Sequence, residues 1–338
     1  MTHPAAGQPR FLITGGGGFI GRALIRRIRA TCPGAAIGIF GRSPQPDLEA
    51  SGVTVHRGDL ADPAAVSRAV AGADGVFHVA ARAGVWGPRA AYFSANLDGT
   101  RHVLAACRQH GVSRLVVTST PSVVFTGEAF RGADESLPYG RNWLGPYAES
   151  KAAAEAEALA ADQPGGLRVT ALRPHLVYGP GDPHILPRIV ARARAGRLRR
   201  VGEGANRVDI SYVDNVAEAH WCAWQALAGG RGGGRPFFVS DGEPVVLWTW
   251  INRLFEAVGV NPVDKAVSLR AAYRIGAVLE GVWRLGLPGE PPMTRFVAVE
   301  LARDHWFDGT AARDVLGYRP PVAPATALAR SAAWLRGE

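Results

Sequence analysis

The sequence predicts an α/β protein with a doubly wound parallel sheet and a smaller, mostly helical second lobe. Short apolar runs alternate with segments of helical periodicity through the first half of the chain, and this alternation is typical of parallel sheets covered by helices on both faces. A glycine-rich turn joins the first apolar run to the first helical segment. Beyond about residue 174, prolines, glycines and aromatic residues interrupt the alternation, which predicts the second lobe.

The composition narrows the class of protein. The 338 residues are enough for one large domain or for two lobes with a substantial core. A hydrophobic content of 47% and a charged content of 20% are typical of a soluble globular protein. The net charge of +9 suits nucleic acid, an anionic membrane surface or an anionic substrate. No nucleic-acid-binding motif accompanies the basic cluster at 192–200, so we interpret it as solvated surface and expect no nucleic-acid partner.

Three features indicate a cytoplasmic protein. Cys32, Cys107 and Cys222 are far apart and form no CxxC pair, so we expect neither a disulfide framework nor a metal site. Residues 1–10 contain no apolar segment of the signal-peptide type. The stretch 266–287 is the most membrane-like, but three arginines and one glutamate interrupt it, which makes it too charged to span a bilayer.

The predicted elements follow one another in a regular order. The apolar run at 11–14 precedes a helical segment at 19–30, in which Ile20, Leu24 and Ile28 share one face. Helical segments such as 62–73 and 99–111 separate several of the later strands. Those strands are expected at 36–40, 53–60, 75–80, 114–120 and 167–174.

The glycine-rich turn at 14–21 reads TGGGGFIG and places Gly15, Gly18 and Gly21 at GxxGxxG spacing. Glycines at these positions allow a sharp turn and a close approach of the backbone to a pyrophosphate. The following helix begins with free N–H groups that bind phosphate oxygens. Because a strand precedes the turn and a helix follows it, the pattern predicts a dinucleotide site rather than an ordinary turn.

The end of the second strand indicates which dinucleotide binds. Folds that read NAD place Asp or Glu about 20 residues after the glycines, but position 41 is Gly and is followed by Arg42 and Ser43. A guanidinium suits a 2′-phosphate, so we expect NADP(H), with a solvated Arg42 as the alternative. Asp59 and Leu60 are placed to meet the adenine. The expected cofactor contacts are Gly15, Gly18, Phe19, Ile20, Gly21, Arg42, Ser43, Asp59, Leu60, Ala80 and Ala81.

These segments divide the chain into two parts. We expect residues 1–173 and 207–243 to form the dinucleotide-binding domain, with the segment PFFVS in the second range returning to the sheet. We expect residues 174–206 and 244–338 to form the substrate-binding lobe.

Tyr147 and Lys151 are spaced for acid–base chemistry. On a helix they share one face, one turn apart. A phenol with a pKa near ~10 exchanges protons poorly at neutral pH, and a nearby ammonium lowers that pKa by favouring the phenolate. Lys151 and Lys265 are the only lysines among 38 basic residues, which indicates that this position needs an ammonium. A compact ammonium can also hold ribose hydroxyls, whereas the larger guanidinium cannot do both in the same space.

Together, the motifs resemble those of the extended short-chain dehydrogenase/reductases, whose sheet is of the Rossmann type. The resemblance rests on TGxxGxxG at 14–21, YxxxK at 147–151 and the hydroxyl-rich segment TSTPS at 118–122. It covers nearly the whole chain. Later segments similar to the family's signatures are NLDGT at 96–100, RPHLVYGPGD at 173–182 and YVDNVAEAH at 212–220.

The resemblance implies a role for each site residue. Tyr147 is then the proton donor and Lys151 its partner, which also contacts the cofactor. Thr120 polarises the substrate carbonyl, with Ser119 and Ser122 as alternatives. The remaining implied residues are Pro174 and Val177 for the cofactor, and Trp86, Thr120 and His175 for the substrate.

The residue after Thr120 indicates which branch of the family the chain resembles. Pro121 stands where sugar dehydratases carry a carboxylate, and the chain resembles the branch similar to 3β-hydroxysteroid dehydrogenases. Within that branch, segments 83–88, 263–280 and 287–296 resemble the bacterial 2-alkyl-3-oxoalkanoate reductases. This resemblance implies NADPH-dependent reduction of the 3-ketone of a fatty β-keto acid, in long-chain olefin biosynthesis.

Two other functions remain open at this point. One is a sterol or steroid dehydrogenase of the same branch, and the other is a non-catalytic dinucleotide-sensing protein, against which the intact Tyr147 and Lys151 pair argues. We expect a homodimer, and other enzymes of the olefin pathway are candidate partners. The basic, amphipathic stretch 266–287 is interpreted either as a peripheral membrane or partner contact or as a helix packed within the lobe.

Overall fold

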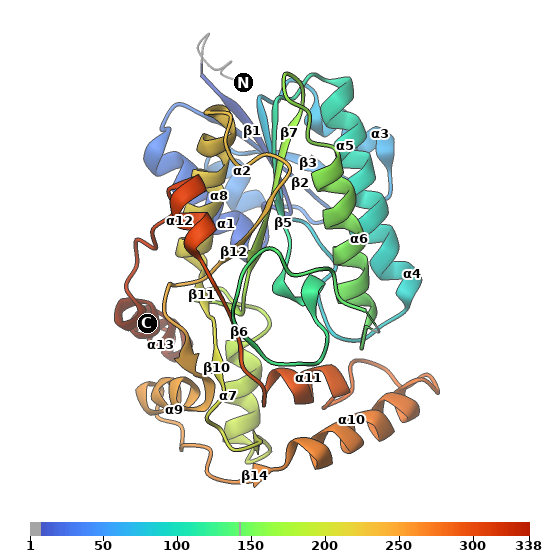
Figure 1. The fold of residues 1–338 in the computed structure, drawn as a ribbon. Helices are drawn as coiled ribbons and strands as arrows, with labels where there is room; N and C mark the ends of the chain where they lie inside the picture. Colours follow the sequence, from blue (N-terminus) through green and yellow to red (C-terminus); the bar gives the residue numbers. More distant parts are fainter. Residues whose placement is uncertain (1–7, 142) are drawn as a thin grey trace.

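A seven-stranded parallel sheet forms the centre of the molecule (Figure 1). The computed structural model describes residues 8–141 and 143–338. The strands predicted from the sequence are all present in the sheet, including the returning strand from PFFVS. Their order across the sheet is β12 (Pro236–Val239), β7 (Arg168–Pro174), β5 (Arg114–Thr118), β4 (Gly75–His78), β1 (Arg10–Thr14), β2 (Ala36–Gly41) and β3 (Thr54–Arg57).

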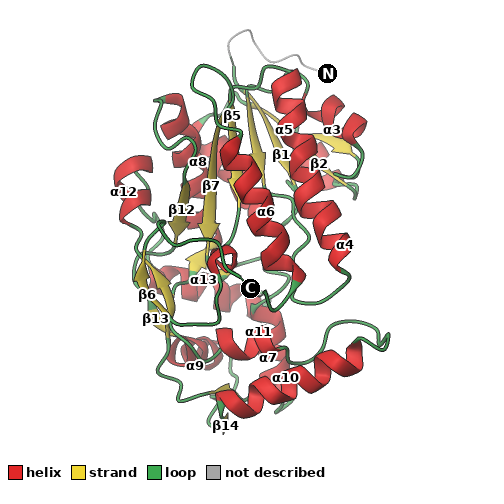
Figure 2. Ribbon diagram, turned by 45° about the vertical axis from the view of Figure 1, so that its right-hand side comes forward, coloured by secondary structure: helices red, strands yellow, loops and turns green. Residues whose placement is uncertain are grey.

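Helices cover both faces of this sheet, as the doubly wound prediction requires (Figures 1 and 2). The two faces are covered by different sets of helices, whose buried side chains belong to separate apolar clusters. One layer contains α1 (Phe19–Thr31), α2 (Pro46–Ala50), α8 (Val213–Ala228) and α12 (Thr310–Leu316), and the other contains α3 (Pro63–Val70), α5 (Gly99–Gln109) and α6 (Pro146–Ala160).

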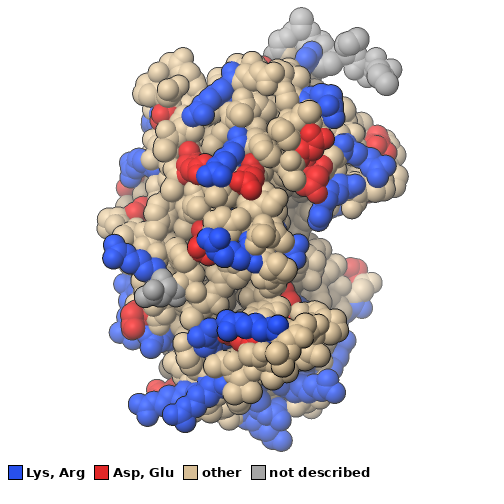
Figure 3. Space-filling model, turned by 90° about the vertical axis from the view of Figure 1, so that its right-hand side faces the viewer, with Lys and Arg blue, Asp and Glu red and all other residues tan. Residues whose placement is uncertain are grey.

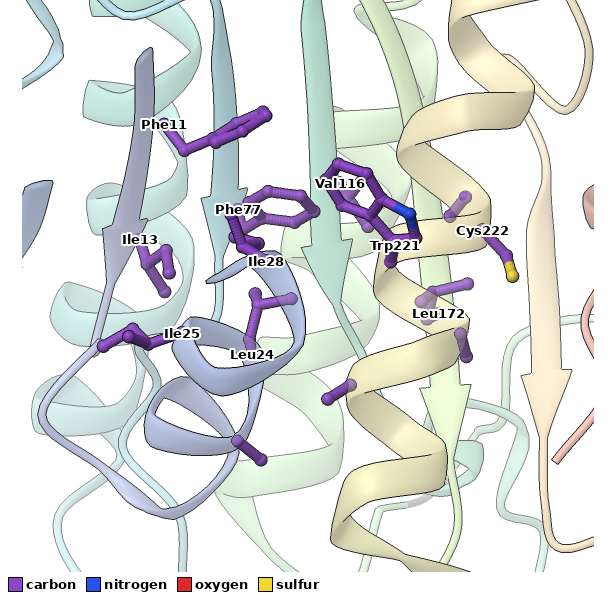
Figure 4. Packing of buried hydrophobic residues seen from close by; sticks show 14 of the residues in the cluster. Phe11, Ile13, Leu24, Ile25, Ile28, Phe77, Val116, Leu172, Trp221 and Cys222 are labelled. Carbon is purple, nitrogen blue, oxygen red and sulfur yellow. The ribbon is translucent and has the colours of Figure 1, made fainter. Parts of the chain in front are cut away.

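The core beside β1 shows how the helical periodicity is used. Leu24 and Ile28 of α1 are buried against the sheet, and Ile20 packs partly buried at the edge of the same cluster. Figure 4 shows Leu24 and Ile28 facing Phe77 of β4 and the indole of Trp221 from α8. The predicted apolar face of α1 is therefore confirmed, and it fixes the helix that follows the glycine turn.

A second lobe lies below the sheet in Figure 1. Its core gathers side chains from β10, α7 and α9, including Trp248 and Phe255. Two further pairs of short strands join segments that are distant in sequence. The elements of the lobe are α7 (Leu186–Arg194), β9 (Arg200–Val201), β10 (Arg207–Val208), β13 (Val245–Val246), α9 (Leu247–Ala257), β14 (Ala266–Val267), α10 (Leu269–Trp283), α11 (Arg295–Glu300), β15 (His305–Phe307) and α13 (Pro324–Arg336).

The two parts are more interleaved than the sequence suggested. The strand β6 (Phe130–Ala133), from the expected dinucleotide-binding domain, pairs with β15 in a four-stranded sheet with β10 and β13. Residues 207–208 also belong to that sheet rather than to the central one. Conversely, Leu316 and Tyr318, expected in the second lobe, are buried against the central sheet.

Short connecting elements complete the chain between the two parts. A π-helix, η1 (Phe93–Asp98), joins α4 (Arg89–Tyr92) to α5, and a 3₁₀ helix, η2 (Pro121–Val124), follows β5. The strand β8 (Val177–Tyr178) pairs with β11 (Ser211–Tyr212). Among the helices that the structure describes, none is both long and apolar enough to cross a bilayer.

A buried ion pair fastens α6 to the sheet. Glu155 of α6 accepts hydrogen bonds from the Nε and Nη2 atoms of Arg173 on β7, the shorter at 2.6 Å, and both side chains are buried. The guanidinium carbon also lies 5.1 Å from the ring centre of Phe238. Two charges removed from water are tolerated here because each is the partner of the other.

We expect loss of either partner to cost far more than loss of both. Arg173→Met leaves an unpaired buried carboxylate and should lower the free energy of unfolding by about 3–5 kcal/mol. The double variant Glu155→Leu/Arg173→Met should recover most of that loss, because no buried charge remains. Denaturant unfolding of the three proteins measures both effects. A single variant as stable as the parent would contradict a clamping role for the pair.

Candidate active site

The carboxyl ends of β1, β4, β5 and β7 meet at one edge of the central sheet, where open α/β folds bind ligands. Helices α1 and α6 begin at this edge. Pro146 is the first residue of α6, a position at which its fixed φ favours a helix start. The helix therefore carries Tyr147 in its first turn, next to the segment that follows β5.

The glycine turn has room for backbone only. Gly15 has a φ of +69°, and a side chain there would come within 2.9 Å of the backbone of Ala80. A side chain on Gly21 would come within 2.5 Å of the carbonyl oxygen of Gly15. Gly18 caps α1, and Phe19 and Ile20 form its first turn. The N–H groups of this turn are thus presented beside a surface without side chains, which fits a pyrophosphate.

The ends of β2 and β3 lie next to this turn. The amide of Gly15 donates to the carbonyl of Phe40 at 2.8 Å, and Gly58 donates to Gly41 at 3.0 Å. A side chain built on Gly41 would meet nothing within 4 Å. The neighbouring residues Arg42, Ser43 and Asp59 are exposed, and Leu60 is half-buried. An exposed guanidinium therefore lies directly after β2, and position 41 carries no carboxylate.

A chain of buried polar groups supports the end of β4. The Thr14 hydroxyl lies 2.8 Å from Nδ1 of His78, and Nε2 of His78 lies 3.0 Å from the hydroxyl of Thr100. Burial and, to a smaller extent, the charge of Lys151 lower the pKa of His78 to about 3, so the ring is neutral. The Thr14 hydroxyl also accepts the N–H of Ala80 at 3.2 Å, which sets the position of the segment with Ala81.

Tyr147 is half-buried at the start of α6. Burial raises the pKa of its phenol to about 12, and a hydrogen bond with the side chain of Thr120 acts in the opposite direction. The ring packs edge-on against Tyr92, with 6.4 Å between ring centres. The structure therefore brings together Tyr147 and Thr120, which the sequence placed 27 positions apart.

Lys151 is buried one turn along the same face of α6. Its Nζ donates to the carbonyl of Thr118, the last residue of β5, at 2.6 Å. Burial lowers the pKa of Lys151 to about 8, while Glu155 opposes this shift.

One expectation about this pair is wrong. The sequence predicted that the ammonium would lower the pKa of Tyr147, yet that pKa is raised, and Thr120 is the group that lowers it. Two physical reasons account for the difference. Desolvation penalises the phenolate more than nearby groups favour it. The Lys151 ammonium is also directed to the carbonyl of Thr118 and is itself disfavoured by burial.

The three candidate hydroxyls after β5 now have different environments. Thr120 caps η2 by accepting the N–H of Ser122 at 3.2 Å and is the neighbour of the phenol. Ser122 is the 3.2 Å hydrogen-bond partner of Thr120. The Ser119 hydroxyl is fully buried, and among the described residues it has no hydrogen-bond partner. This arrangement favours Thr120 as the group that meets a substrate oxygen.

Sequence reasoning missed two residues that hold the site together. Asn96 of η1 accepts the N–H of Arg82 at 2.7 Å and donates to the hydroxyl of Ser150 at 3.0 Å. These bonds join the segment after β4 to α6 beside Lys151. Both residues lie in segments that the sequence analysis had singled out, NLDGT and the helix of Tyr147, so those patterns were the available signal.

Trp86 lies near the phenol through an intermediate residue. It is half-buried, and its carbonyl accepts the hydroxyl of Tyr92 at 3.0 Å. Since Tyr92 packs against Tyr147, the loop that carries Trp86 borders the site. Its contact with substrate stays a prediction.

His175 is buried and hydrogen-bonded within the protein, and its contact with substrate stays a prediction. Its buried Nε2 is 2.5 Å from Nδ1 of His305, and Nε2 of His305 is 2.6 Å from the carbonyl of Glu300. Burial lowers the pKa of His175 well below its ordinary value, and His305 adds to this effect. The ring nitrogens of His175 and His305 and the carboxylate of Glu300 lie within 4.8 Å of one another. His175 is thus a buried link between β7 and β15.

The segment after β7 continues through Pro174 and Val177. Pro174 is buried at the end of the strand, and Val177 is half-buried in β8. Between them, Leu176 has a φ of 44°, a conformation that costs a residue with a side chain roughly 1–3 kcal/mol. Strain of this kind persists where the surrounding structure holds it in place and often marks a ligand site.

Comparisons with known proteins identify the family to which this chain belongs. A sequence profile of the 3-beta hydroxysteroid dehydrogenase/isomerase family matches residues 12–270. The chain belongs to this family. The predicted branch of the extended short-chain dehydrogenase/reductases is thereby confirmed, and the protein is an enzyme of the oxidoreductase type.

Individual members of the family and a solved structure extend this finding. The chain is 49% identical over 326 residues to the 2-alkyl-3-oxoalkanoate reductase of Stenotrophomonas maltophilia, covering 95% of this chain and 98% of that one. It is 44% identical to the enzyme of the same name from Shewanella oneidensis, over 94% and 84% of the two chains. The structure of MoeE5 in complex with UDP-glucose and NAD is similar, with a TM-score of 0.74, 28% identity and coverage of 97% and 99%.

The lowered pKa of Lys151 can be measured directly, because the chain has only two lysines. In protein labelled at the lysine side chain, NMR should show two signals, and Lys151→Arg should remove the one assigned to Lys151. We expect that signal to titrate near pH 8, so that the charge is present below this pH and is lost as the pH rises through it. Titration near the ordinary lysine value of about 10.4 would contradict the burial argument.

Proposed function

We propose that this protein is an NADP(H)-dependent 2-alkyl-3-oxoalkanoate reductase, which converts the 3-ketone of a fatty β-keto acid to the 3-hydroxy acid in long-chain olefin biosynthesis. The observation that carries the proposal is the position of the Tyr147 phenol, in the first turn of α6, near the Thr120 hydroxyl just beyond β5. The near full-length identity to two reductases of this name supports the substrate class.

The phenol is suited to donate a proton. Because the pKa of Tyr147 is about 12, its hydroxyl stays protonated at neutral pH. Reduction of a ketone creates an alkoxide, which is basic enough to take that proton as it forms. Thr120 can hold the same oxygen by its hydroxyl and so orient the carbonyl towards Tyr147. General acid catalysis of this kind contributes roughly 10²–10⁴-fold to the rate.

The glycine cradle supplies the place for the second reactant. A reduced nicotinamide dinucleotide, when bound there, supplies the hydride. Gly15, Gly18 and Gly21 would hold its pyrophosphate, and the exposed Arg42 beside Gly41 would hold a 2′-phosphate. Lys151, whose buried Nζ faces the end of β5, would hold the ribose hydroxyls. The NAD bound by MoeE5 supports a nicotinamide dinucleotide at this edge of the fold.

The lobe offers apolar surface to the alkyl chains. Phe296 of α11 packs against Phe125, with 5.0 Å between ring centres, and Phe125 directly follows the 3₁₀ helix that Thr120 caps. Trp86, in the loop after β4, also borders the site. We expect these aromatic side chains to bind the alkyl chains of the substrate beside the reacting ketone.

The first experiment measures NADPH oxidation with a synthetic 2-alkyl-3-oxoalkanoate. The parent should turn over this substrate, and Tyr147→Phe should lose roughly 10²–10⁴-fold in kcat because the ring remains but the acid is gone. Ser119→Ala is the matched control, since it removes the neighbouring hydroxyl, which has no hydrogen-bond partner among the described residues.

Two results would argue against this assignment. Turnover of Tyr147→Phe within about three-fold of the parent is far less than general acid catalysis contributes and would remove Tyr147 from the mechanism. Faster turnover of a 3-oxosteroid than of the β-keto acid would favour the steroid dehydrogenase alternative.

A second experiment tests the choice of cofactor. Charge-assisted hydrogen bonds contribute about 1.5–3 kcal/mol, so kcat/KM should favour NADPH over NADH by about ten-fold or more. Arg42→Ala should lower kcat/KM for NADPH and leave kcat/KM for NADH nearly unchanged. Gly41→Asp should shift the preference towards NADH, because the open space at Gly41 accepts a carboxylate that binds ribose and repels the 2′-phosphate.

Parallel kcat/KM values for both cofactors distinguish the outcomes. Equal values in the parent would refute the argument from the missing acid at position 41. A strong NADPH preference that survives Arg42→Ala would keep the cofactor but place its phosphate on another residue, of which Ser43 is the first candidate.

A further inference from the structure

Helix α10 and the turn after it carry an exposed apolar surface. In the part of the chain that the structure describes, every large apolar side chain classed as exposed falls in residues 275–287. Val278 is 66% exposed and Leu285 is 87% exposed. Residues 275, 278 and 282 follow a spacing of three and four, which places them on one side of α10, and residues 285 and 287 lie in the turn after it. The side chains of this surface, here called the α10 face, are Ile275, Val278, Val282, Leu285 and Leu287.

The opposite side of α10 is already occupied. A side chain on Gly276 would come within 2.7 Å of the backbone nitrogen of Arg295, so α10 packs closely on the start of α11. Glu280 accepts the backbone N–H of Arg295 at 2.8 Å and pairs with its guanidinium at 2.7 Å. Ser268 caps the helix by accepting the N–H of Ala271. These contacts fix the rotation of α10 about its axis. The apolar face therefore points outward, away from α11.

The exposed charges within residues 269–287 have one sign. Arg270, Arg274 and Arg284 are exposed on or directly after the helix, whereas Glu280, its single acidic residue, is buried in the pair with Arg295. The pairing of β14 with β9 brings the arginine-rich segment 192–200 next to the start of α10. Figure 3 shows this end of the molecule as tan surface bordered by blue, with little red.

We propose that the α10 face docks on the surface of an anionic lipid bilayer. An apolar stripe bordered by arginines is the pattern of helices that lie in the plane of a membrane interface. The apolar side chains would enter the acyl boundary, and the arginines would meet lipid phosphates. A second copy of the chain fits less well, because two α10 faces would bring arginines together without an exposed carboxylate on the helix to pair with them.

Helix α10 is linked through α11 to a residue near the candidate active site. The helix packs on α11, whose Phe296 contacts Phe125 beside the 3₁₀ helix that follows Thr120. A bilayer held at the α10 face would therefore lie against the pair of helices whose second member contacts Phe125. The inference itself rests on exposure and charge alone and does not depend on the proposed substrate.

Vesicle sedimentation of the full chain tests the proposal. We expect binding to vesicles of phosphatidylcholine mixed with phosphatidylglycerol, weak binding to phosphatidylcholine alone, and release at high salt. Val278→Glu/Leu285→Glu should abolish binding, because both side chains are highly exposed and the substitutions place charge in the apolar stripe. Arg270→Gln/Arg274→Gln should weaken binding by about five-fold for each arginine.

A matched variant separates local contact from net charge. Arg68→Gln/Arg108→Gln removes two exposed arginines from α3 and α5, on another part of the surface, and should bind like the parent. Thermal unfolding followed by circular dichroism confirms that each variant is folded, and light scattering gives its oligomeric state.

Three outcomes would overturn the proposal. The first is absence of binding by the parent to the anionic vesicles. The second is binding that persists in the folded Val278→Glu/Leu285→Glu variant, or that falls equally in the α3 and α5 control. The third is a parent dimer that becomes monomeric on Val278→Glu/Leu285→Glu, which would assign the face to a second copy of the chain.

Discussion

Two buried bonds between α6 and the central sheet determine the geometry on which the site depends. Lys151 donates to the carbonyl of Thr118 at the end of β5, and one turn later Glu155 pairs with Arg173 on β7. Because both residues lie on the same face as Tyr147, these bonds set the rotation of the helix. The phenol is thereby directed towards Thr120, two residues beyond the carbonyl that Lys151 holds.

Removal of water is the main electrostatic influence in this site. It raises the pKa of Tyr147 to about 12, lowers that of Lys151 to about 8 and lowers that of His78 to about 3. Each shift favours the neutral form, as desolvation does in general. Near neutral pH the site therefore contains a protonated phenol, a neutral imidazole and one ammonium, which is a combination suited to giving a proton to a forming alkoxide.

In the lobe below the sheet, two packed helices present side chains in two directions, towards the site and towards the outside of the molecule. Helix α11 directs Phe296 inward to Phe125, while α10, packed on α11 through Gly276 and Glu280, directs its apolar face outward. A change at the contact between these helices would therefore affect both sides of the lobe. The His175 and His305 link adds a second tie, since it joins the end of β7 to the strand that follows α11.

Much of the fold and of the site was determined by local sequence. The strands of the central sheet and the apolar face of α1 follow from the periodicity of the sequence. The glycine turn follows from backbone conformations and close contacts that only glycine allows. The placement of Tyr147 and Lys151 on one face of α6 follows from a spacing of four on a helix. Such signals act within one or two turns of chain, so they can be read without knowing which distant segments meet.

Only the tertiary structure decided the features that depend on burial and on distant contacts. It separated Thr120 from Ser119, whose hydroxyl is enclosed, and it placed His175 against His305, 130 positions away. It also joined residues 130–133 to β15 and reversed the expected shift of the Tyr147 pKa. The physical reason is the same in each case. Desolvation and long-range pairing depend on which segments of the folded chain lie together, and no local pattern of residues records that.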